Sequence, residues 1–402
     1  MKRLFIIFYV AINICPLFGD ITVELVESFP IETTLDHPEI RNTSEVWLEM
    51  INGANTSLDF GEFYISHKKG EALEPILKAV CQAAERGVSI RFIVDGNMYK
   101  TYPETVDSLQ KHKNIQIHIY ELNKITEGTH HAKYFIVDGK EIFLGSQNFD
   151  WRSLKHIHEL GIRLSHSGIV SFYQDIFNLD WLLSDPKASY KEILQTLSQC
   201  DEHVIFKISS KEYGDMTIIP TASSPSLVYY RQNWDELQIK RLIDSAQESI
   251  ILQFLSYSPL SGGELYEALD FSLRRAAARG VKVQMILSDW NFYSPRIEYI
   301  KSLQAIPYVD IKFSTIPEAQ EGYIGYARVE HSKFIVVDSK AVWLGTSNAS
   351  KSYFHKDRNV GIVIENEKLS QQVSHVFYHS WNSEYCQPVD LCKKYHRKET
   401  SE

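Results

Sequence analysis

Residues 130–148 read "HHAKYFIVDGKEIFLGSQN", and residues 330–348 read "EHSKFIVVDSKAVWLGTSN". In each stretch an apolar run, typical of a buried strand, is followed by a turn signal and by a second strand that returns antiparallel. The spacing of His, Lys, Asp, Gly and Asn is the same in both stretches. The chain therefore carries one strand-turn-strand unit twice.

The polar side chains of this unit are placed so that they can meet. His131 and Lys133 are two residues apart on the first strand, so both side chains leave the same face. The return strand brings Ser146 and Asn148 back beside them. The corresponding residues of the second copy are His331, Lys333, Thr346 and Asn348. We expect Ser146 and Thr346 to bind substrate. Packing does not account for them, because they are the polar members of otherwise apolar strands.

The duplication extends well beyond these hairpins. Residues 81–96, "CQAAERGVSIRFIVDG", match residues 274–289, "RRAAARGVKVQMILSD". Both are typical of an amphipathic helix that is stopped by a glycine and followed by a β-branched strand. Each half then has the order helix, strand, helix, strand, hairpin. This order predicts an α/β fold, an αβ sandwich with a mixed sheet in each half, with two similar domains packed face to face across a pseudo-twofold axis.

The N-terminus, "MKRLFIIFYVAINICPLFGD", has the form of a secretory signal, with two basic residues before a mostly apolar run. We expect residues 1–19 to be the signal peptide; a buried first helix or a short membrane anchor are the alternatives. The N-terminal domain is then expected at 20–190, a linker region rich in turn formers at 191–225, and the C-terminal domain at 226–402. A secreted, periplasmic or organelle-lumenal protein follows, without a stable membrane span after cleavage.

Charge and cysteines limit the partners. The formal charge is −9, and loss of Lys2 and Arg3 with the signal makes it −11, so any recognition of a phosphate has to be local. The cysteines left after cleavage are Cys81, Cys200, Cys386 and Cys392. An exported chain could oxidise them in three pairings, and Cys386 and Cys392 are close enough for a local bridge. Free buried thiols are the alternative.

Two units facing each other would gather two imidazoles, two ammonium groups and two carboxamides around one point. That set suits a phosphodiester, because the ammonium and amide donors can hold the non-bridging oxygens as charge builds on them. One neutral imidazole can attack phosphorus and form a phosphohistidine, while the other, protonated, gives a proton to the departing oxygen. The lysines supply the positive charge, so neither a metal nor another cofactor is expected.

The repeated H-x-K-x-x-x-x-D, with its trailing G-S-x-N and G-T-x-N, resembles the phospholipase D superfamily over nearly all of residues 22–385. The segments "GSQNFDWRSLKHIHELG", "YARVEHSKFIVVD" and "LGTSNASKSYF" most resemble its endolysosomal branch and the viral relatives of that branch. The resemblance implies two tandem phospholipase D-like αβα sandwich domains and a hydrolase that trims single-stranded DNA or RNA from the 5′ end. Some members of the branch also transfer phosphatidyl groups. By resemblance, the chemistry is carried by His131, Lys133, Asn148, His331, Lys333 and Asn348.

Two further residues are candidates for orienting the histidines. Glu159 lies 28 residues after His131, and Asn359 lies 28 residues after His331. In the family an acidic residue near this spacing orients an active-site histidine, sometimes across the domain interface. A carboxylate raises the pKa of a histidine and an amide does less, so the histidine facing Glu159 is the expected acid. Pairing across the interface makes His331 the acid and His131 the nucleophile; pairing within each half reverses the order.

Other residues near the motifs have two interpretations. Asp138 and Asp338 belong to the motif and are counted with the catalytic candidates, although turn formation and a buried ion pair would also explain them. Four residues that follow the motifs could bind substrate or pack in the core: Trp151, Arg152, Tyr353 and Phe354. Nucleic-acid bases can stack on such aromatic rings. The histidines 112, 118, 156 and 158 are spaced like zinc ligands, but without a cysteine or carboxylate cluster we expect them to be solvated.

The substrate is therefore expected to be single-stranded nucleic acid or a phospholipid. An acidic protein is a poor non-specific binder of duplex DNA, which favours a site that accepts one free end, as in a 5′ exonuclease. The alternative is a phospholipase D or transphosphatidylase, which should expose apolar loops; residues 289–300 are the candidate. A non-catalytic binding protein is disfavoured because both motifs are intact. A homodimer is a further option.

Overall fold

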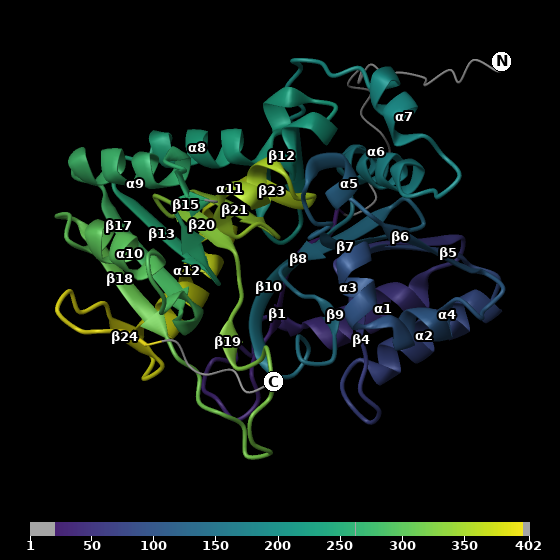
Figure 1. Cartoon of the computed structure of the whole chain (residues 1–402), viewed down its shortest axis with the longest axis horizontal. Helices are drawn as coiled ribbons and strands as arrows, with labels where there is room; N and C mark the ends of the chain where they lie inside the picture. Colours follow the sequence, from purple (N-terminus) through teal and green to yellow (C-terminus); the bar gives the residue numbers. More distant parts are fainter. Residues whose placement is uncertain (1–20, 262, 397–402) are drawn as a thin grey trace.

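Each half of the chain builds one large mixed β-sheet. The computed structural model describes residues 21–261 and 263–396, so the expected signal peptide lies outside the described residues. In Figure 1 the first half is purple to blue and the second is green to yellow, and the two halves lie side by side. Within the described ranges, no helix is long and apolar enough to cross a membrane.

Seven strands of each sheet, β1 to β6 and β12 to β18 in the spatial orders below, correspond one to one. The first, in spatial order, contains β2 (Arg41–Asn42), β1 (Val23–Ser28), β10 (Ile157–Leu164), β8 (Glu141–Gly145), β7 (Lys133–Val137), β3 (Ser57–Glu62), β5 (Ser89–Asp95) and β6 (Ile115–Tyr120). The second contains β11 (Phe206–Ser210), β12 (Gly214–Ser223), β23 (Asn359–Glu365), β21 (Ala341–Gly345), β20 (Phe334–Val337), β13 (Ser249–Phe254), β17 (Lys282–Ser288), β18 (Val309–Ser314) and β24 (Cys386–Pro388). In both, the pairing is antiparallel from β1 to β3, or from β12 to β13, and parallel over the next two strands. The predicted duplication is confirmed.

Helices cover both faces of each sheet. The longer ones are α1 (Thr43–Gly53), α2 (Glu74–Glu85), α6 (Ser167–Leu183), α8 (Asp235–Ser245), α9 (Ala268–Ala278), α10 (Arg296–Gln304) and α12 (Glu367–Asn382). Because side chains alternate along a strand, Phe135 of β7 packs towards α1 and α2, whereas Tyr134 and Ile136 face the other half. The cluster on that inner face is continuous with Phe334 and Leu344 of the second sheet and includes α6 and α12. Two αβα sandwiches therefore share one apolar interface.

The remaining elements are short. They are β4 (Ile65–Ser66), β9 (Phe149–Asp150), β14 (Tyr257–Ser258), β15 (Leu260–Ser261), β16 (Glu264–Leu265), β19 (Val329–Glu330), β22 (Ala349–Ser350), α3 (Gly96–Thr101), α4 (Pro103–Leu109), α5 (Asn123–Thr126), α7 (Tyr190–Thr196) and α11 (Lys351–His355). Of these, β19 matters most for the site, because it precedes His331 and pairs in parallel with β10 of the other half.

The contacts between the halves are reciprocal. His130 bridges Arg358 in parallel, and His158 pairs with Glu330 in parallel. The backbone N–H of His131 donates to the carbonyl of Arg358, and the N–H of His331 donates to the carbonyl of His158, each at 2.9 Å. Adding 200 to the residue numbers of one set gives the other set. This reciprocity is the signature of a pseudo-twofold axis.

The expected linker needs a correction. Strands β11 and β12 lie within residues 191–225, yet β11 pairs with β12, β12 pairs with β23, and both belong to the second sheet. The turn formers in "IIPTASSPS" did not prevent a strand here, because pairing partners outweigh local propensity. β12 holds the place in its sheet that β1 holds in the first.

The state of the four cysteines was left open between a local disulfide bridge and free thiols. All four thiols of the described residues are free, so the expected local bridge between Cys386 and Cys392 is not formed. Cys386 is buried at the start of β24, where it pairs with Ser314, while Cys392 is exposed. Packing in the sheet edge thus holds one thiol inside and leaves the other outside.

Candidate active site

The two histidine–lysine pairs meet at the interface between the halves. His131 and His331 are 6% and 7% exposed, and Lys133 and Lys333 are each 1% exposed. Burial lowers the pKa of His131, and the ammonium groups of both lysines lower it further; the pKa of His331 is lowered for the same reasons. Each lysine therefore acts on both imidazoles, so the predicted gathering of four groups is what the fold produces.

Each lysine is held by its own motif. Lys133 Nζ donates to the carbonyl of His131 at 2.6 Å, and Lys333 Nζ donates to the carbonyl of His331. Burial lowers the pKa of Lys133 to about 7, although Glu62 and other carboxylates favour its charged form. A bound phosphodiester anion would add negative charge and favour both ammonium groups.

His131 faces an amide across the interface. Its Nδ1 lies 3.0 Å from Oδ1 of Asn359. The carboxamide of Asn359 has a fixed orientation, because its Nδ2 donates to the carbonyl of Tyr353 at 2.8 Å and Oδ1 accepts from the hydroxyl of Thr346 at 2.8 Å. An oxygen facing Nδ1 can only accept, so the proton of the neutral imidazole sits on Nδ1. Nε2 of His131 is left with its lone pair.

His331 faces a carboxylate across the interface. Its Nδ1 is hydrogen-bonded to Oε1 of Glu159, whose other oxygen accepts from the hydroxyl of Ser153. Glu159 is fully buried, and burial raises its pKa to about 8, although Ser153 and the two lysines oppose the rise. At neutral pH this pair keeps a proton in the bond between Nδ1 and Oε1, and a second proton remains on Nε2 of His331. Of the two histidines, His331 is the one with a proton to give.

The two asparagines of the motif are buried beside the lysines. Asn148 and Asn348 are 6% and 1% exposed, and within the described ranges Oδ1 of each has no hydrogen-bond partner. Buried polar atoms normally have one. Among the described residues the two carboxamide oxygens are therefore left unpaired, while the side chain of Asn348 is hydrogen-bonded to that of Tyr353.

The glycine before each asparagine permits a close approach of strands. A Cβ on Gly145 would lie 2.6 Å from the Cα of Gly161, and a Cβ on Gly345 would lie 3.0 Å from the Cα of Gly361. Both pairs are directly opposite in the sheet. Only glycine lets the return strand pack this tightly against the strand that carries Glu159 or Asn359.

Ser146 and Thr346 were expected to bind substrate, and their positions correct this. Both are 0% exposed. The hydroxyl of Ser146 bonds the backbone of Leu160 at 3.2 Å, and the hydroxyl of Thr346 is bonded by the N–H of Val360 at 3.1 Å. The two hydroxyls fasten the return strand to its neighbour, and Thr346 also orients Asn359.

Asp138 and Asp338 lie at the far ends of the motif strands, away from the histidines. The carboxylate of Asp138 accepts the backbone N–H groups of residues 55–57, and that of Asp338 accepts those of residues 247–249, at 2.7 to 3.2 Å. These bonds lower the pKa of Asp138 to about 2 against some desolvation. Counting Asp138 and Asp338 with the catalytic residues was therefore wrong. Their carboxylates bind backbone N–H groups, and the buried ion pair that was the alternative is not what they form.

Of the four residues expected around the site, only Tyr353 contacts a motif histidine. Its ring lies edge-on to His131 at 4.9 Å. Phe354 is 1% exposed and Trp151 is 9% exposed, and both belong to the apolar clusters, so core packing was the right alternative for them. Arg152 is paired with Asp150 at 2.8 Å and therefore has no free charge for a substrate.

Two neighbours of the site were not predicted. Phe63, at the end of β3, packs its ring 4.8 Å from that of His131 and lies under the ammonium group of Lys133. Arg296, at the start of α10, acts electrostatically on Tyr353; its Nε is buried without a partner among the described residues. Nothing in the sequence marks either one, because both come from segments outside the repeated motif.

The histidines that were expected to be solvated have other surroundings. His156 and His158 are 0% exposed, which corrects that expectation. His118 stacks on Trp181 at 3.7 Å, and His112 lies 3.4 Å from the thiol of Cys81. Both faces of β10 are buried, because β19 of the second half pairs with the start of this strand.

Comparison with known proteins supports the same architecture. The family described as "Cardiolipin synthase, PLD-like domain" matches residues 47–181 and 239–381, once in each half. The crystal structure of a phosphatidylserine synthase from Haemophilus influenzae superposes with a TM-score of 0.64 at 14% identity, over 86% of this chain and 85% of that one. That likeness is one of fold.

Several relatives align with both halves of the chain at once. Phospholipase D Z of Dictyostelium discoideum is 28% identical over 395 residues, 92% of this chain and 91% of the relative. The 5′-3′ exonuclease PLD3 of Bos taurus is 28% identical over 93% of this chain and 82% of the relative, and the 5′-3′ exonuclease PLD4 of Mus musculus is 27% identical over 91% and 79%. With two copies of the matched domain spanning most of its length, the chain belongs to the phospholipase D superfamily and is a phosphodiesterase of that group.

Proposed function

We propose that this phosphodiesterase works without a catalytic metal, through a phosphohistidine on His131, and that it removes nucleotides from the 5′ end of single-stranded DNA or RNA. The observation that carries the mechanism is the unequal pairing of the histidines: His131 with Asn359, and His331 with Glu159. The first pairing leaves a lone pair on Nε2, and the second leaves a proton there.

The reaction then has two balanced steps. Nε2 of His131 attacks phosphorus, the P–N bond forms, and the bond to the 5′ oxygen of the remaining strand breaks while His331 gives that oxygen its proton. In the second step water attacks phosphorus, His331 takes the proton of the water, and the P–N bond breaks. Lys133, Lys333, Asn148 and Asn348 hold the non-bridging oxygens in both steps.

A polynucleotide fits the surroundings of His131 because of Arg296. Its guanidinium lies over the ring of Tyr293 at 4.6 Å and acts on Tyr353, which contacts His131. No carboxylate bonds it among the described residues. A cation one ring away from the reacting phosphate is suited to a second phosphate of the same strand, and the aromatic rings are suited to its bases.

The buried position of the histidines supports attack at an end. Both are less than a tenth exposed. The end of a strand reaches such groups with less displacement of the surrounding side chains than its middle does. The names of two relatives, both 5′-3′ exonucleases, agree with this reading.

A phospholipase D activity is the second candidate. Two Dictyostelium relatives carry that name, and residues 289–300, the candidate for an exposed apolar loop, include the partly exposed Trp290. Its ring lies 6.1 Å from that of Tyr326, which is 54% exposed. Trp and Tyr are the residues that favour a membrane surface.

The deciding experiment offers the mature protein, in EDTA at pH 5.5 and 7.5, three substrates. They are a single-stranded oligonucleotide with a 5′-hydroxyl, phosphatidylcholine vesicles, and a chromogenic diester with one phosphate. We expect stepwise release of nucleotides from the 5′ end, and no cleavage of a circular strand of the same sequence. Choline release with an intact oligonucleotide would make the chain a lipid enzyme.

The variant Arg296→Met separates the substrate from the chemistry. We expect its KM for the oligonucleotide to rise about tenfold, and its turnover of the chromogenic diester to stay unchanged, because only the polymer has a second phosphate. An equal loss on both substrates would show that Arg296 serves the reacting phosphate itself.

A further inference from the structure

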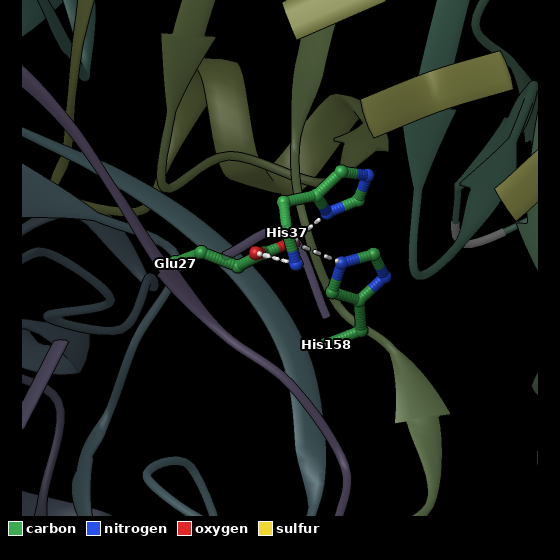
Figure 2. Close-up of side chains that lie close together, drawn as sticks. All are labelled: Glu27, His37 and His158. Atoms are coloured by element: carbon green, nitrogen blue, oxygen red, sulfur yellow. Dashed lines mark hydrogen bonds and ion pairs between the residues drawn. The ribbon is translucent and has the colours of Figure 1, made fainter. Parts of the chain in front are cut away.

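A second cluster of titratable side chains lies at the interface, and the proposed reaction does not use it. It consists of Glu27 on β1, His158 on β10 and His37 in the segment between β1 and β2, and Figure 2 shows the three side chains together. They are 1%, 0% and 2% exposed. The cluster is next to the hydrogen-bonded pair of Glu159 and His331, here called the acid pair. His158 directly precedes Glu159, and the carbonyl of His158 accepts the N–H of His331.

The three donors converge on one point. Oε1 of Glu27 lies 2.8 Å from Nδ1 of His37 and 2.8 Å from Nε2 of His158, and all three ligand atoms lie within 4.8 Å of one another. In Figure 2 both rings turn a nitrogen towards the carboxylate. Ligand atoms at tetrahedral zinc, about 2.0 to 2.1 Å from the ion, are roughly 3.3 Å apart, so small shifts would open the space for an ion.

The ring nitrogen of each histidine that points away from Glu27 already has a hydrogen-bond partner. Nδ1 of His158 lies 2.6 Å from Oε2 of Glu330, and Nε2 of His37 lies 2.9 Å from Nδ1 of His379. When these outer nitrogens carry the protons, the inner nitrogens turn their lone pairs towards Glu27. Metal-binding histidines have this arrangement, with the second nitrogen donating to a carboxylate or another acceptor.

The charges of the cluster call for a cation. Two carboxylates, Glu27 and Glu330, are buried here, and Oε1 of Glu330 is a buried oxygen that lacks a hydrogen-bond partner within the described ranges. Without an ion, the charges and hydrogen bonds of these two carboxylates raise the pKa of His158 to about 10 against its burial, so a proton on His158 balances one of them. A divalent ion that displaced this proton would balance both.

The position in the second half that corresponds to His158 is occupied by a positively charged arginine. There Arg358, the counterpart of His158, is fully buried and bonds both oxygens of Asp180 at 2.8 Å. The counterpart of Asp180 is Ser380, which lies 3.5 Å from Nδ1 of His158. On the side of the acid pair the chain thus replaces an arginine ion pair by two histidines and two carboxylates.

We propose that Glu27, His37 and His158 bind a zinc ion that ties β1 and β10 of the first half to Glu330 and α12 of the second. Two imidazoles and one carboxylate form a known zinc donor set, and a water would complete the tetrahedron. The ion lies behind Glu159 and touches no reacting atom. It fixes the interface on which the acid pair stands, and it does not depend on the proposed substrate.

A surface cavity lies beside the cluster. A cavity of about 540 Å³ is lined by Thr34, His375, Tyr378, His379, Asn382 and Ser383. Of these, His379 bonds His37, and His375 lies edge-on to the ring of His37 at 5.5 Å. An ion entering this cavity meets two histidines one helical turn apart on α12 before it reaches the cluster.

The test measures metal in the mature, untagged protein. Zinc is quantified in the purified protein, and a metal-stripped sample is titrated with zinc chloride in a calorimeter. We expect about one zinc per chain in the wild type, less than a tenth of that in Glu27→Gln and His37→Gln, and full binding in His118→Gln. The last is the matched control, because His118 stacks on Trp181 and is not one of the three converging donors.

X-ray absorption at the zinc edge of the wild type decides the case even where a variant does not fold. We expect a shell of nitrogen and oxygen with two imidazoles and no sulfur. A sulfur ligand, a wild type that binds no zinc, or folded variants that bind it like the wild type would each overturn the site. The proton on His158 would then pair with Glu27 and Glu330 in place of the ion.

Discussion

The two halves of this protein have one fold and one motif, but their histidines face different partners. Asn359 stands opposite His131, and Glu159 stands opposite His331. Reciprocal backbone pairing gives both histidines the same placement, so the difference lies in the chemistry of the facing residue alone. The duplicated scaffold supplies the geometry, and in the proposed mechanism one amide in place of one carboxylate separates the nucleophile from the acid.

The largest effects should come from removing the histidines. We expect His131→Ala to lose turnover by about 10⁴-fold or more, because the nucleophile is gone. His331→Ala should lose about 10²- to 10⁴-fold, because an acid is missing and the nucleophile remains. With a label on the 5′-terminal nucleotide, rapid acid-free quenching should find the label bound to protein in His331→Ala only. Label bound in His131→Ala would reverse the two roles.

The next largest effect should come from Glu159→Gln. We expect a rate about 10 to 100 times lower, because the proton on Nε2 of His331 loses its carboxylate partner. The pKa of Glu159, raised by burial from its ordinary value of 4.5 to about 8, also has a consequence for stability. Between these values the folded state holds a proton that the unfolded state has released, so this contribution to stability is lost as pH rises.

Melting temperatures of the wild type and Glu159→Gln between pH 5 and 8.5 measure this consequence. The wild type should lose stability towards pH 8 more steeply than the variant. Parallel curves would mean that Glu159 is ionised throughout this range.

A smaller effect is expected from Asn359→Asp, which makes the two pairings alike. The new carboxylate raises the pKa of His131, so more of its Nε2 is protonated at acid pH. A rise of one pKa unit lowers the rate on the acid side about tenfold and changes it little on the alkaline side. The pH–rate profile on the chromogenic diester shows the shift, and an unchanged acid limb would contradict the assignment of His131 as the nucleophile.

The smallest effect on rate should come from Asp138→Asn and Asp338→Asn. Each carboxylate accepts backbone N–H groups at the end of the site strands away from the histidines, so both variants should keep the rate per folded molecule. Each should lose about 1 to 2 kcal/mol of unfolding free energy, because these bonds are partly exposed. Urea unfolding measures the loss. Since the pKa of Asp138 is lowered to about 2, its contribution is present above its ordinary value of 3.8 and is lost as pH falls towards 2.

Local pattern was enough for much of the architecture. The alternation in residues 130–148 and its repeat predicted the hairpin, the duplication, the mixed sheets and the placing of His131 beside Lys133. It failed at residues 206–223, where turn formers became strands β11 and β12 because the second sheet offered them partners. It also failed at Ser146, and it left Trp151 and Phe354 open between core and site, since a residue next to a motif can point into the core as readily as into the site.

The sequence by itself determined that two H-x-K motifs stand on equivalent strands, because strand periodicity is a local property. Only the tertiary structure decided that Glu159 faces His331 and that Asn359 faces His131. It alone brought Glu27 and His37 to His158. These contacts join residues that are 10 to 228 positions apart. No local pattern encodes them, since they arise only when the two sheets bury a common apolar face.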